Sequence, residues 1–595
     1  MKRFFTVGLL LTTSLSAAGF ATAGAGTSPA DNAGNITELF DPAAVARSVC
    51  GVAQGDPEKN AFIQLAAATA ATAPMPAARP PLWQGLGTLS FKITTTKPEA
   101  QAYFDQGLRL AYAFNHAEAI RAFKAGQEID PGCALCFWGE ALALGPNINM
   151  AMPYDVNEKA LAVLKKAQSL KAKVSAKEQA LIDALAARYS TDPKATRKQL
   201  DQAFAAAMMS VHRAFPDDPE VAAIAIEAAM DVAPWDYWQP GGREPTVAMK
   251  DAYPLMEKLL AAHPNHPGAI HYYIHIMEQS AWPEKAVPPS DRLAALMPSA
   301  GHIVHMPSHI YFRVGRYKDA LDSNIAAVKA DEAFFAQAES DPVYKSGYYP
   351  HNIHFALESA AMAGDGPTTI AMAEKLSGVI PPEALRAVPL AQPIAVAAPL
   401  AHLRFSEPKV ILNISDFGSD VPYMQGLWRY VRGSAHALNG DVKAATAELD
   451  ALVTLQAKED FSAVEDAAIP AKAILAVAED VLRARIAGAK GDWSAAVTAL
   501  EEAVKGQDAL PYTEPAYWYY PARQSLGVAL LKAGRAKDAV EVLRRSLMDA
   551  PNNGWALYAL KEAAGQAGDA AGAAEYSKLF EKAWVGATPP ALNRI

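Results

Sequence analysis

The stretch AYFDQGLRLAYAFNHAEAIRAFKAGQEIDP, residues 102–131, predicts two helices joined by a short turn. Its small residues at Gly107, Ala119 and Gly126 allow two antiparallel helices to approach each other closely. Pro131 ends the second helix, because proline cannot continue the helical hydrogen-bond ladder. The stretch is therefore typical of a helical hairpin.

The same spacing returns near the other end of the chain, in RQSLGVALLKAGRAKDAVEVLRRSLMDAP, residues 523–551. A fixed period of this kind is the sign of a repeat architecture. Some spacings stretch to about 50 residues, so loops or extra helices interrupt the array. Further copies of the pattern are centred on Gly315/Ala320, Gly440/Ala445, Gly491/Ala496 and Gly568/Ala573.

This spacing resembles the tetratricopeptide repeat (TPR) family, over most of residues 96–585. The resemblance implies an all-α fold, a TPR-like α-solenoid of helical hairpins with a concave binding face. A wider set of stretches resembles a group of exported bacterial TPR proteins and leaves the chemistry open. These stretches are FNHAEAIRAF, CALCFWGEA, PWDYW, HPGAIHYYIH, HMPSHIYFRVGRY and PHNIHF.

The first residues, MKRFFTVGLLLTTSLSAAGFATA, predict a secretory signal peptide over 1–23, with cleavage after Ala23. A basic start, a short apolar run and small residues at the end give this prediction, so we expect a periplasmic or secreted protein. No later stretch reaches about 18 uninterrupted apolar residues, so no membrane span is expected. The net charge of −9 and the scattered basic residues give no footprint for nucleic acid.

Composition divides the rest of the chain. Residues 24–88 are rich in alanine and proline and predict a linker. Residues 378–425, of which 378–402 carry five prolines and little charge, predict a connector. Between them, 89–377 is expected to be an N-terminal TPR-like array, followed by a C-terminal TPR array over 426–595. Cys133 and Cys136 form a CxxC, for which a local disulfide in an oxidising compartment and a redox or metal role are the alternatives.

Histidines concentrate in one part of the chain: nine of the 13 lie between residues 263 and 354. His263 and His266 flank a proline-containing turn and are expected in a loop. The other seven fall in three groups, in which the members are three, four or seven residues apart and share one helix face. They are His271 and His275, then His302, His305 and His309, then His351 and His354.

Neighbouring hairpins of a solenoid pack side by side, so three such faces could converge on one transition-metal site. Imidazoles at this spacing are typical helical ligands of zinc, copper, iron or nickel. Glu278 and Glu358 share the faces of the first and third groups. Each is predicted as a ligand, a general base or an acceptor that orients a ring. Pro307 interrupts the middle group, so its helix either begins near Met306 or is bent.

For function the sequence leaves two classes open. The first is a metalloprotein with a multi-histidine site, for which copper is favoured over zinc, because seven imidazoles without a nearby cysteine pair suit copper. A copper-dependent oxidase or oxygenase would resemble the all-histidine helical sites of dicopper oxidases. A zinc hydrolase would use Glu278 or Glu358 as base. The second class is a non-enzymatic TPR scaffold that binds a peptide or protein partner on its concave face in the cell envelope.

The surroundings of the histidines are rich in tyrosine and tryptophan, which could wall a pocket or serve ordinary helix packing. Upstream, Asn147 and Asn149 follow a Gly-Pro pair, and they are expected to cap a loop or to bind a ligand. The substrate cannot be read from these features; the aromatic side chains hint at an aromatic compound.

Overall fold

The computed structural model describes residues 79–150, 152, 156–338, 344–416 and 421–595. These residues form helices and connecting segments, and the pairing outside helices is limited there to two isolated β-bridges. The prediction of an all-α, TPR-like α-solenoid is confirmed. The expected signal peptide, Cys50 and residues 24–78 of the expected linker lie outside the described residues. Over the described ranges, no helix has both the length and the apolar character needed to cross a membrane.

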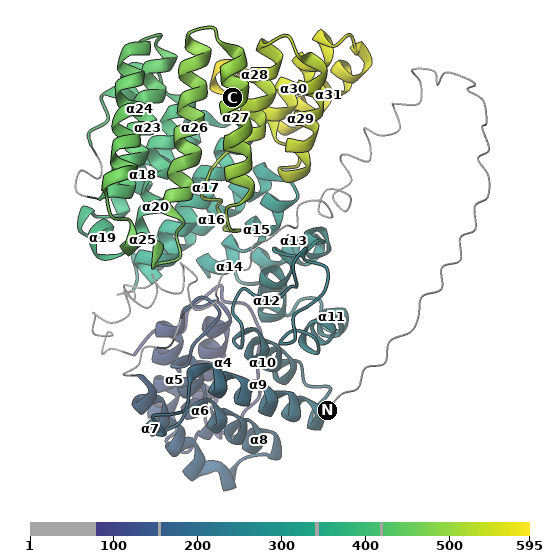
Figure 1. Cartoon of the computed structure of the whole chain (residues 1–595). Coiled ribbons are helices and arrows are strands. Elements are labelled where there is room, and N and C mark those ends of the chain that lie inside the picture. Colours follow the sequence, from purple (N-terminus) through teal and green to yellow (C-terminus); the bar gives the residue numbers. More distant parts are fainter. Residues whose placement is uncertain (1–78, 151, 153–155, 339–343, 417–420) are drawn as a thin grey trace, which may run out of the picture.

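The first part of the chain forms a stack of helices that begins in the lower part of Figure 1 and reaches α15 and α16 near its middle. Its helices are α4 (Pro98–Tyr112), α5 (His116–Ile129), α6 (Ala134–Ala143), α7 (Val156–Leu170), η3 (Lys171–Lys173), α8 (Ala176–Leu185), η4 (Ala186–Arg188), α9 (Arg197–Ala214), α10 (Pro219–Met230), α11 (Ala252–Ala262), α12 (Pro267–Met277), η5 (Pro283–Ala286), α13 (Val287–Leu296), α14 (Gly301–His305), α15 (Pro307–Arg313) and α16 (Tyr317–Phe335).

The second part continues the stack into the upper part of the same view (Figure 1). Its helices are η6 (Tyr344–Tyr348), α17 (Tyr349–Ala363), α18 (Gly366–Val379), α19 (Pro382–Ala387), α20 (Ala391–Ala395), α21 (Ala397–Phe405), α22 (Pro408–Leu412), α23 (Pro422–Leu438), α24 (Val442–Lys458), α25 (Ser462–Glu465), α26 (Ala471–Ala489), α27 (Trp493–Asp508), α28 (Ala522–Lys532), α29 (Ala536–Asp549), α30 (Gly554–Gln566), α31 (Ala570–Ala583) and η7 (Leu592–Arg594).

Helices that follow each other along the chain pack as pairs, such as α4 with α5, α26 with α27 and α28 with α29. Glycine makes the close approach possible at equivalent places. A Cβ atom on Gly107 would lie 2.6 Å from the Phe123 ring, and one on Gly527 would lie 2.4 Å from Leu543. Real side chains do not approach so closely, so the repeat spacing seen in the sequence reports helix contact directly.

Most hairpins turn through one shared backbone motif. In the α28–α29 turn, the N–H of Gly534 donates to the carbonyl of Leu531, and the next N–H, of Arg535, donates to that of Leu530. Gly534 has a φ of +77°, a left-handed conformation in which glycine carries no steric penalty. Glycine occupies the same place, with φ between +74° and +84°, in five other hairpins: Gly315, Gly364, Gly440, Gly491 and Gly568.

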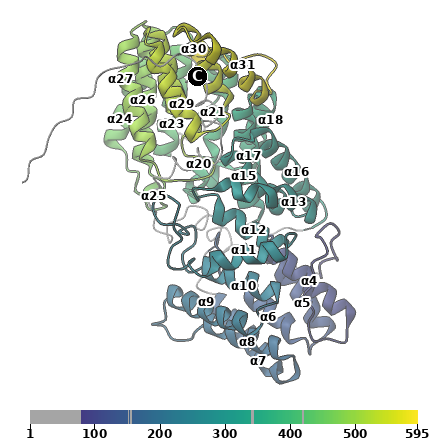
Figure 2. The ribbon, with the colours of Figure 1, turned by 90° about the vertical axis from the view of Figure 1, so that its right-hand side faces the viewer.

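Two large apolar cores lie one above the other. One is built from residues between Leu86 and Tyr348, and the other from residues between Leu385 and Ile595. Helices α12 to α15 lie where the lower and upper parts meet, in both views of the ribbon (Figures 1 and 2). The histidine-rich segment is therefore at the junction of the two halves.

The segment expected as a Pro-rich connector contains four short helices, α19 to α22, in its described residues. Its prolines do not prevent this, because Pro382 and Pro408 stand at the first position of α19 and α22, where no N–H is needed. In the first part of the chain, a disulfide joins Cys133 and Cys136 at the start of α6. The structure therefore contains the local disulfide, one of the two alternatives for this CxxC.

Candidate metal centre

Three imidazoles from two helices form a first cluster, here called the first triad: His271, His275 and His302. His271 and His275 are one turn apart on α12, and their Nε2 atoms lie 3.1 Å from each other. His302, on α14, brings a ring nitrogen to them, so that one ligand atom from each residue falls within 4.8 Å of the others. All three side chains are buried.

A second cluster repeats this arrangement, and we call it the second triad: His305, His309 and His351. The Nε2 atoms of His305 and His309 lie 2.9 Å apart. His351, at the start of α17, completes the set, again with ligand atoms within 4.8 Å of one another. The triads adjoin, because the ring centroids of His302 and His305 are 5.8 Å apart and those of His275 and His309 are 6.1 Å apart.

The stretch around Pro307 is divided between the two triads. Helix α14 ends at His305 and α15 begins at Pro307, so the helix is interrupted at Met306. This is the first of the two alternatives expected from the sequence, a helix that begins near Met306. His302 belongs to the first triad, whereas His305 and His309 face each other across the break. Each triad thus combines a pair of histidines four residues apart with a single one from a later helix.

The hydrogen-bond partners of the rings determine which nitrogen carries the proton in four of the six. The Nδ1 atom of His271 lies 2.6 Å from the carbonyl oxygen of Tyr112, and that of His275 lies 3.1 Å from Glu278 Oε1. Carbonyl and carboxylate oxygens only accept, so both Nδ1 atoms donate. In a neutral imidazole, Nε2 then carries a lone pair. The two Nε2 atoms of the first triad therefore face each other with their lone pairs.

In the second triad, the Nδ1 atoms of His305 and His309 also face oxygen atoms. His305 Nδ1 lies 2.6 Å from Asn324 Oδ1, and the Asn324 amide is oriented by its own donation to the Ala320 carbonyl, at 2.7 Å. His309 Nδ1 lies 2.6 Å from Glu514 Oε2 and 2.8 Å from Glu278 Oε2. Both rings therefore present Nε2 to the centre of the triad.

Burial and the neighbouring rings decide the charge of these imidazoles. Burial lowers the pKa well below its usual range for His271, His275, His302, His305 and His351. In His309 burial also opposes the charge, but the carboxylates of Glu278 and Glu514 outweigh it and raise its pKa to about 10. A proton on His309 can bridge the His305–His309 pair, whereas the His271–His275 pair has no such proton.

Glu278 connects the two triads. One carboxylate oxygen faces the Nδ1 of His275 and the other faces the Nδ1 of His309. Oε1 hydrogen-bonds His275, which is the position of an acceptor that orients a ring, whereas Oε2 makes an ion-pair contact with His309 and has no hydrogen-bond partner. Glu514, on the segment between α27 and α28, also contacts His309.

His354 and Glu358 do not join the triads. The His354 ring packs edge-on against Tyr519 at 5.5 Å, and burial lowers its pKa to about 3. Glu358 lines a separate small cavity with Arg404 and Tyr520, and burial raises its pKa well above the usual range. His263 and His266 flank the turn before α12 as expected, and the His266 side chain caps that helix.

Aromatic rings cover the first triad. Phe114 stacks on His302 at 5.4 Å and on His275 at 5.9 Å, and the Trp235 ring meets His275 edge-on at 5.1 Å. Tyr348 lies edge-on against His302 at 4.6 Å. The tyrosine- and tryptophan-rich surroundings therefore include some rings that wall the histidines, while others, such as Trp238, pack in the core.

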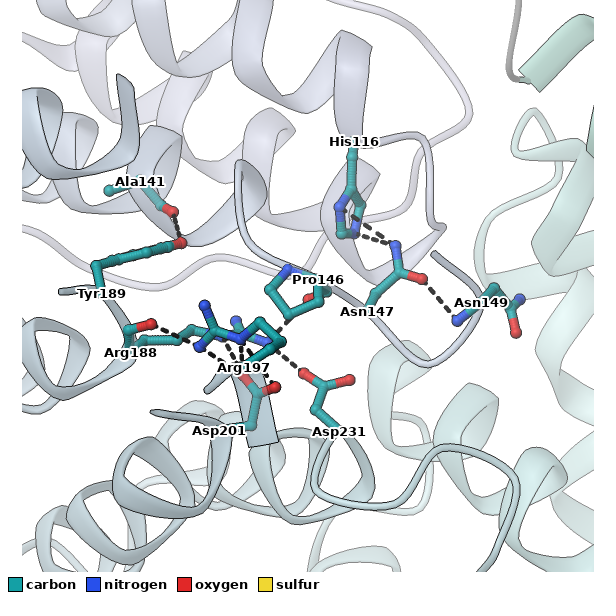
Figure 3. Close-up of polar contacts among 10 residues, drawn as sticks. All are labelled: His116, Ala141, Pro146, Asn147, Asn149, Arg188, Tyr189, Arg197, Asp201 and Asp231. Atoms are coloured by element: carbon teal, nitrogen blue, oxygen red, sulfur yellow. Dashed lines mark hydrogen bonds and ion pairs between the residues drawn. The ribbon is translucent and has the colours of Figure 1, made fainter. Parts of the chain in front are cut away.

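A buried ionic network contacts the loop that contains Pro146 and Asn147 (Figure 3). Arg188 is 1% exposed and contacts the carboxylates of Asp231 and Asp201, and it also donates to the carbonyl of Pro146. Two residues further on, the carbonyl of Ile148 accepts from Trp235 Nε1 at 2.9 Å. The network thus fixes the loop that holds Trp235 against His275.

Asn147 and Asn149 act within that loop. Asn147 Oδ1 accepts from the N–H of Asn149 at 2.8 Å, and its amide nitrogen lies 3.4 Å from both ring nitrogens of His116 (Figure 3). The expected capping role of Asn147 accounts for these contacts.

Four residues of the site were not among those singled out from the sequence: Tyr112, Phe114, Asn324 and Glu514. Asn324 lies in an ordinary helical repeat and carries no signal. Glu514 lies in LPYTEPAYWYYP, residues 510–521, an aromatic insertion that lengthens the connection between two repeat helices. Because this insertion interrupts the repeat period, it could have indicated from the sequence that the segment has a role outside the repeat.

No protein-family model matches the chain, and no curated protein matches it. Among solved structures, the human IFIT1 dimer with PPP-AAAA is 12% identical, with a TM-score of 0.32 over 80% of this chain and 94% of that chain. Yeast Tom70 is 12% identical, with a TM-score of 0.27 over 79% of this chain and 89% of that chain. These values are too low to transfer partners or activity from those proteins to this chain. On the evidence of its own helical hairpins, the chain is a TPR-like α-solenoid.

Proposed function

We propose that this protein is a metalloprotein in which each triad binds one transition-metal ion, with copper favoured, and that the resulting dinuclear centre performs oxidative chemistry. The ligands would be the Nε2 atoms of His271, His275, His305 and His309, together with one ring nitrogen each from His302 and His351. Copper at such a centre supplies one-electron redox chemistry and a place for dioxygen.

The observation that carries this proposal is the His271–His275 pair. Two lone pairs at 3.1 Å repel each other unless a cation lies between them. Burial opposes a proton in that position, because it holds the pKa of both rings far below neutrality. Two imidazole nitrogens bound to one ion at about 2.0–2.1 Å would lie about 2.9–3.4 Å apart at bond angles of about 90–110°. The Nε2–Nε2 distances of the His271–His275 pair and of the His305–His309 pair fall in this range.

The donor set favours copper. Each triad offers only imidazole, without thiolate, and copper binds such nitrogen sites most tightly among the divalent first-row metals. A zinc hydrolase would need a free carboxylate near the open coordination position of the ion. Glu278 is less suited to that task, because both of its oxygens contact ring Nδ1 atoms.

Two further parts of the proposal concern context. Export to the periplasm or the medium follows from the N-terminal sequence and fits the Cys133–Cys136 disulfide, which an oxidising compartment favours. The TPR-like fold is also compatible with a peptide or protein partner on its concave face. A scaffold role alone would leave the six converging imidazoles without an explanation.

The test is copper binding by protein purified without a histidine tag. Elemental analysis after reconstitution should give one ion per triad, and the double variant His305→Ala/His309→Ala should lose the ion of the second triad. His263→Ala and His436→Ala, which change histidines outside the triads, are the matched controls and should keep both ions.

Two results would contradict the proposal. One is metal content below about a tenth of an equivalent for every transition metal tested, since imidazole sites of this kind bind metal tightly. The other is unchanged metal content in a folded His305→Ala/His309→Ala protein. The first result would favour the scaffold, and the second would exclude the second triad as a metal site. Oxidation of phenolic test compounds by the copper-loaded protein, compared with the zinc-loaded protein, then separates oxidase from hydrolase.

A further inference from the structure

The turn between α4 and α5 has the same backbone motif as six other hairpins but carries a different residue. The N–H of Phe114 donates to the Ala111 carbonyl at 3.0 Å, and that of Asn115 donates to the Leu110 carbonyl at 3.0 Å. This is the pattern of the glycine turns, and Phe114 has the matching left-handed φ of +56°. A phenylalanine thus stands where the other hairpins have glycine.

The left-handed conformation costs free energy for a residue with a Cβ atom. In four of the six glycine turns the backbone conformation is the constraint, because a Cβ atom at Gly440, Gly491, Gly534 or Gly568 would meet nothing within 4 Å. Strain of this kind persists where the surrounding structure or the function requires the side chain.

The Phe114 side chain is 3% exposed, and its ring lies on the first triad. Its centroid is 4.4 Å from that of His271, 5.4 Å from that of His302 and 5.9 Å from that of His275. Through the carbonyl of Tyr112, the same turn also accepts the Nδ1 proton of His271. The turn therefore touches every ring of the first triad.

Trp235 also combines a positive φ with a ring that contacts the first triad. Four non-glycine residues of the described chain have a positive φ, and two of them are aromatic: Phe114 and Trp235. Both aromatic rings contact His275, Phe114 stacked with an interplanar angle of 19° and Trp235 edge-on with an angle of 79°. The two strained aromatic residues of these ranges therefore meet at one imidazole.

We infer that Phe114 and Trp235 are positioning residues of the first triad. Their rings prevent rotation of His275 and His302 and keep water from the ring faces, so that only nitrogen edges remain open to a metal ion. The inference rests on the proposed metal function and adds that the first hairpin of the solenoid, far from α12 in sequence, is part of the centre.

The first variant for the test is Phe114→Gly. It installs the residue that the other six turns use, so the backbone motif is kept and only the ring is lost. Copper(II) is titrated against a competing chelator, and the visible and electron paramagnetic resonance spectra of the bound copper are recorded. We expect one of the two ions to bind about tenfold or more weakly with a changed spectrum, because partners that orient ligands typically contribute this much to metal affinity.

Two more variants complete the design. Phe104→Leu, on α4 and buried away from the histidines, is the control for loss of a core ring and should bind copper like the parent protein. Trp235→Leu removes the half-buried second ring and should weaken the same ion, even if Phe114→Gly does not fold.

Parent-like affinity and spectrum in a folded Phe114→Gly or Trp235→Leu protein would overturn the inference while the proposed function stands. Failure of the parent protein to bind copper would overturn both.

Discussion

The Glu514 carboxylate lies 2.6 Å from His309 Nδ1, across 205 residues of sequence. The same segment places the Tyr512 ring 5.7 Å from the Arg313 guanidinium, and Arg313 donates to the Glu278 carbonyl at 2.7 Å. A connection between two C-terminal repeat helices is therefore part of the histidine site, and the two halves of the solenoid meet through it.

Replacing Glu514 should weaken the second triad selectively. In Glu514→Ala, His309 loses one of its two carboxylate partners, and copper affinity at that triad should fall about tenfold, whereas Glu514→Gln, which keeps an acceptor oxygen, should lose less. Chelator competition measures both. Glu501→Gln, an exposed change on neighbouring α27, is the control. Equal loss at both ions would show that the contact is not specific to the second triad.

Glu278 should behave differently, because it contacts one ring of each triad. Glu278→Ala removes the acceptor from both His275 and His309, so both ions should bind more weakly, each by about tenfold or more. The same titration, together with elemental analysis, gives the two affinities. If only one ion is affected, the carboxylate does not link the two triads in solution.

The Arg188 network should contribute strongly to the stability of the first part of the chain. Arg188→Met leaves the Asp231 carboxylate buried without its cation, whereas Asp201 keeps Arg197, and loss of a buried partner of this kind typically costs about 3–5 kcal/mol. Denaturant unfolding followed by circular dichroism measures the loss. Arg535→Met, which breaks an exposed pair with Asp538, should change stability by less than about 1 kcal/mol. Similar losses in the two variants would contradict the prediction.

The contributions of His116 and His354 to stability should fall in mild acid. Burial lowers the pKa of His116 to about 4 and that of His354 to about 3 in the folded protein, from 6.5. Below pH 6.5 these two residues bind more protons in the unfolded chain, so the stability that they contribute above that pH is lost as the pH falls towards 4 and then 3. His116 alone accounts for about 3 kcal/mol.

Unfolding free energies of the metal-free protein between pH 7 and pH 4 test this expectation. His116→Gln and His354→Leu should each reduce the slope. A slope that is the same in both variants and in the parent protein would show that these rings are protonated without cost in the folded state.

The hairpins could be predicted because their glycines report local geometry. Gly107 and Gly527 mark close helix contacts, and Gly534 marks a left-handed turn, so their spacing in sequence is enough to identify the repeat. The seven histidines could be found by their spacing for the same reason. Six of them meet in the structure.

The grouping of those histidines could not be predicted, because it depends on how helices pack. His302 and His305 lie on the same short helix, α14, yet they belong to different triads, and His305 pairs with His309 across the interruption at Met306. His354 shares a helix with His351, but at about 60° around the axis it faces Tyr519. Glu514 comes from the other half of the chain. Phe114 could have been identified from the sequence. It stands five residues before Ala119, as Gly534 stands five residues before Ala539, so it occupies the place of the turn glycine.

The contact between Glu514 and His309 has a consequence for the order in which the centre is completed. Synthesis proceeds from the N-terminus, so a growing chain that has reached residue 500 already contains every imidazole of both triads. It still lacks Glu514, one of the two carboxylates that contact His309 Nδ1. A chain of that length holds the turn and the rings of the first triad, whereas its second triad is short of one orienting partner. The second triad therefore gains its full set of orienting residues only when the chain reaches residue 514.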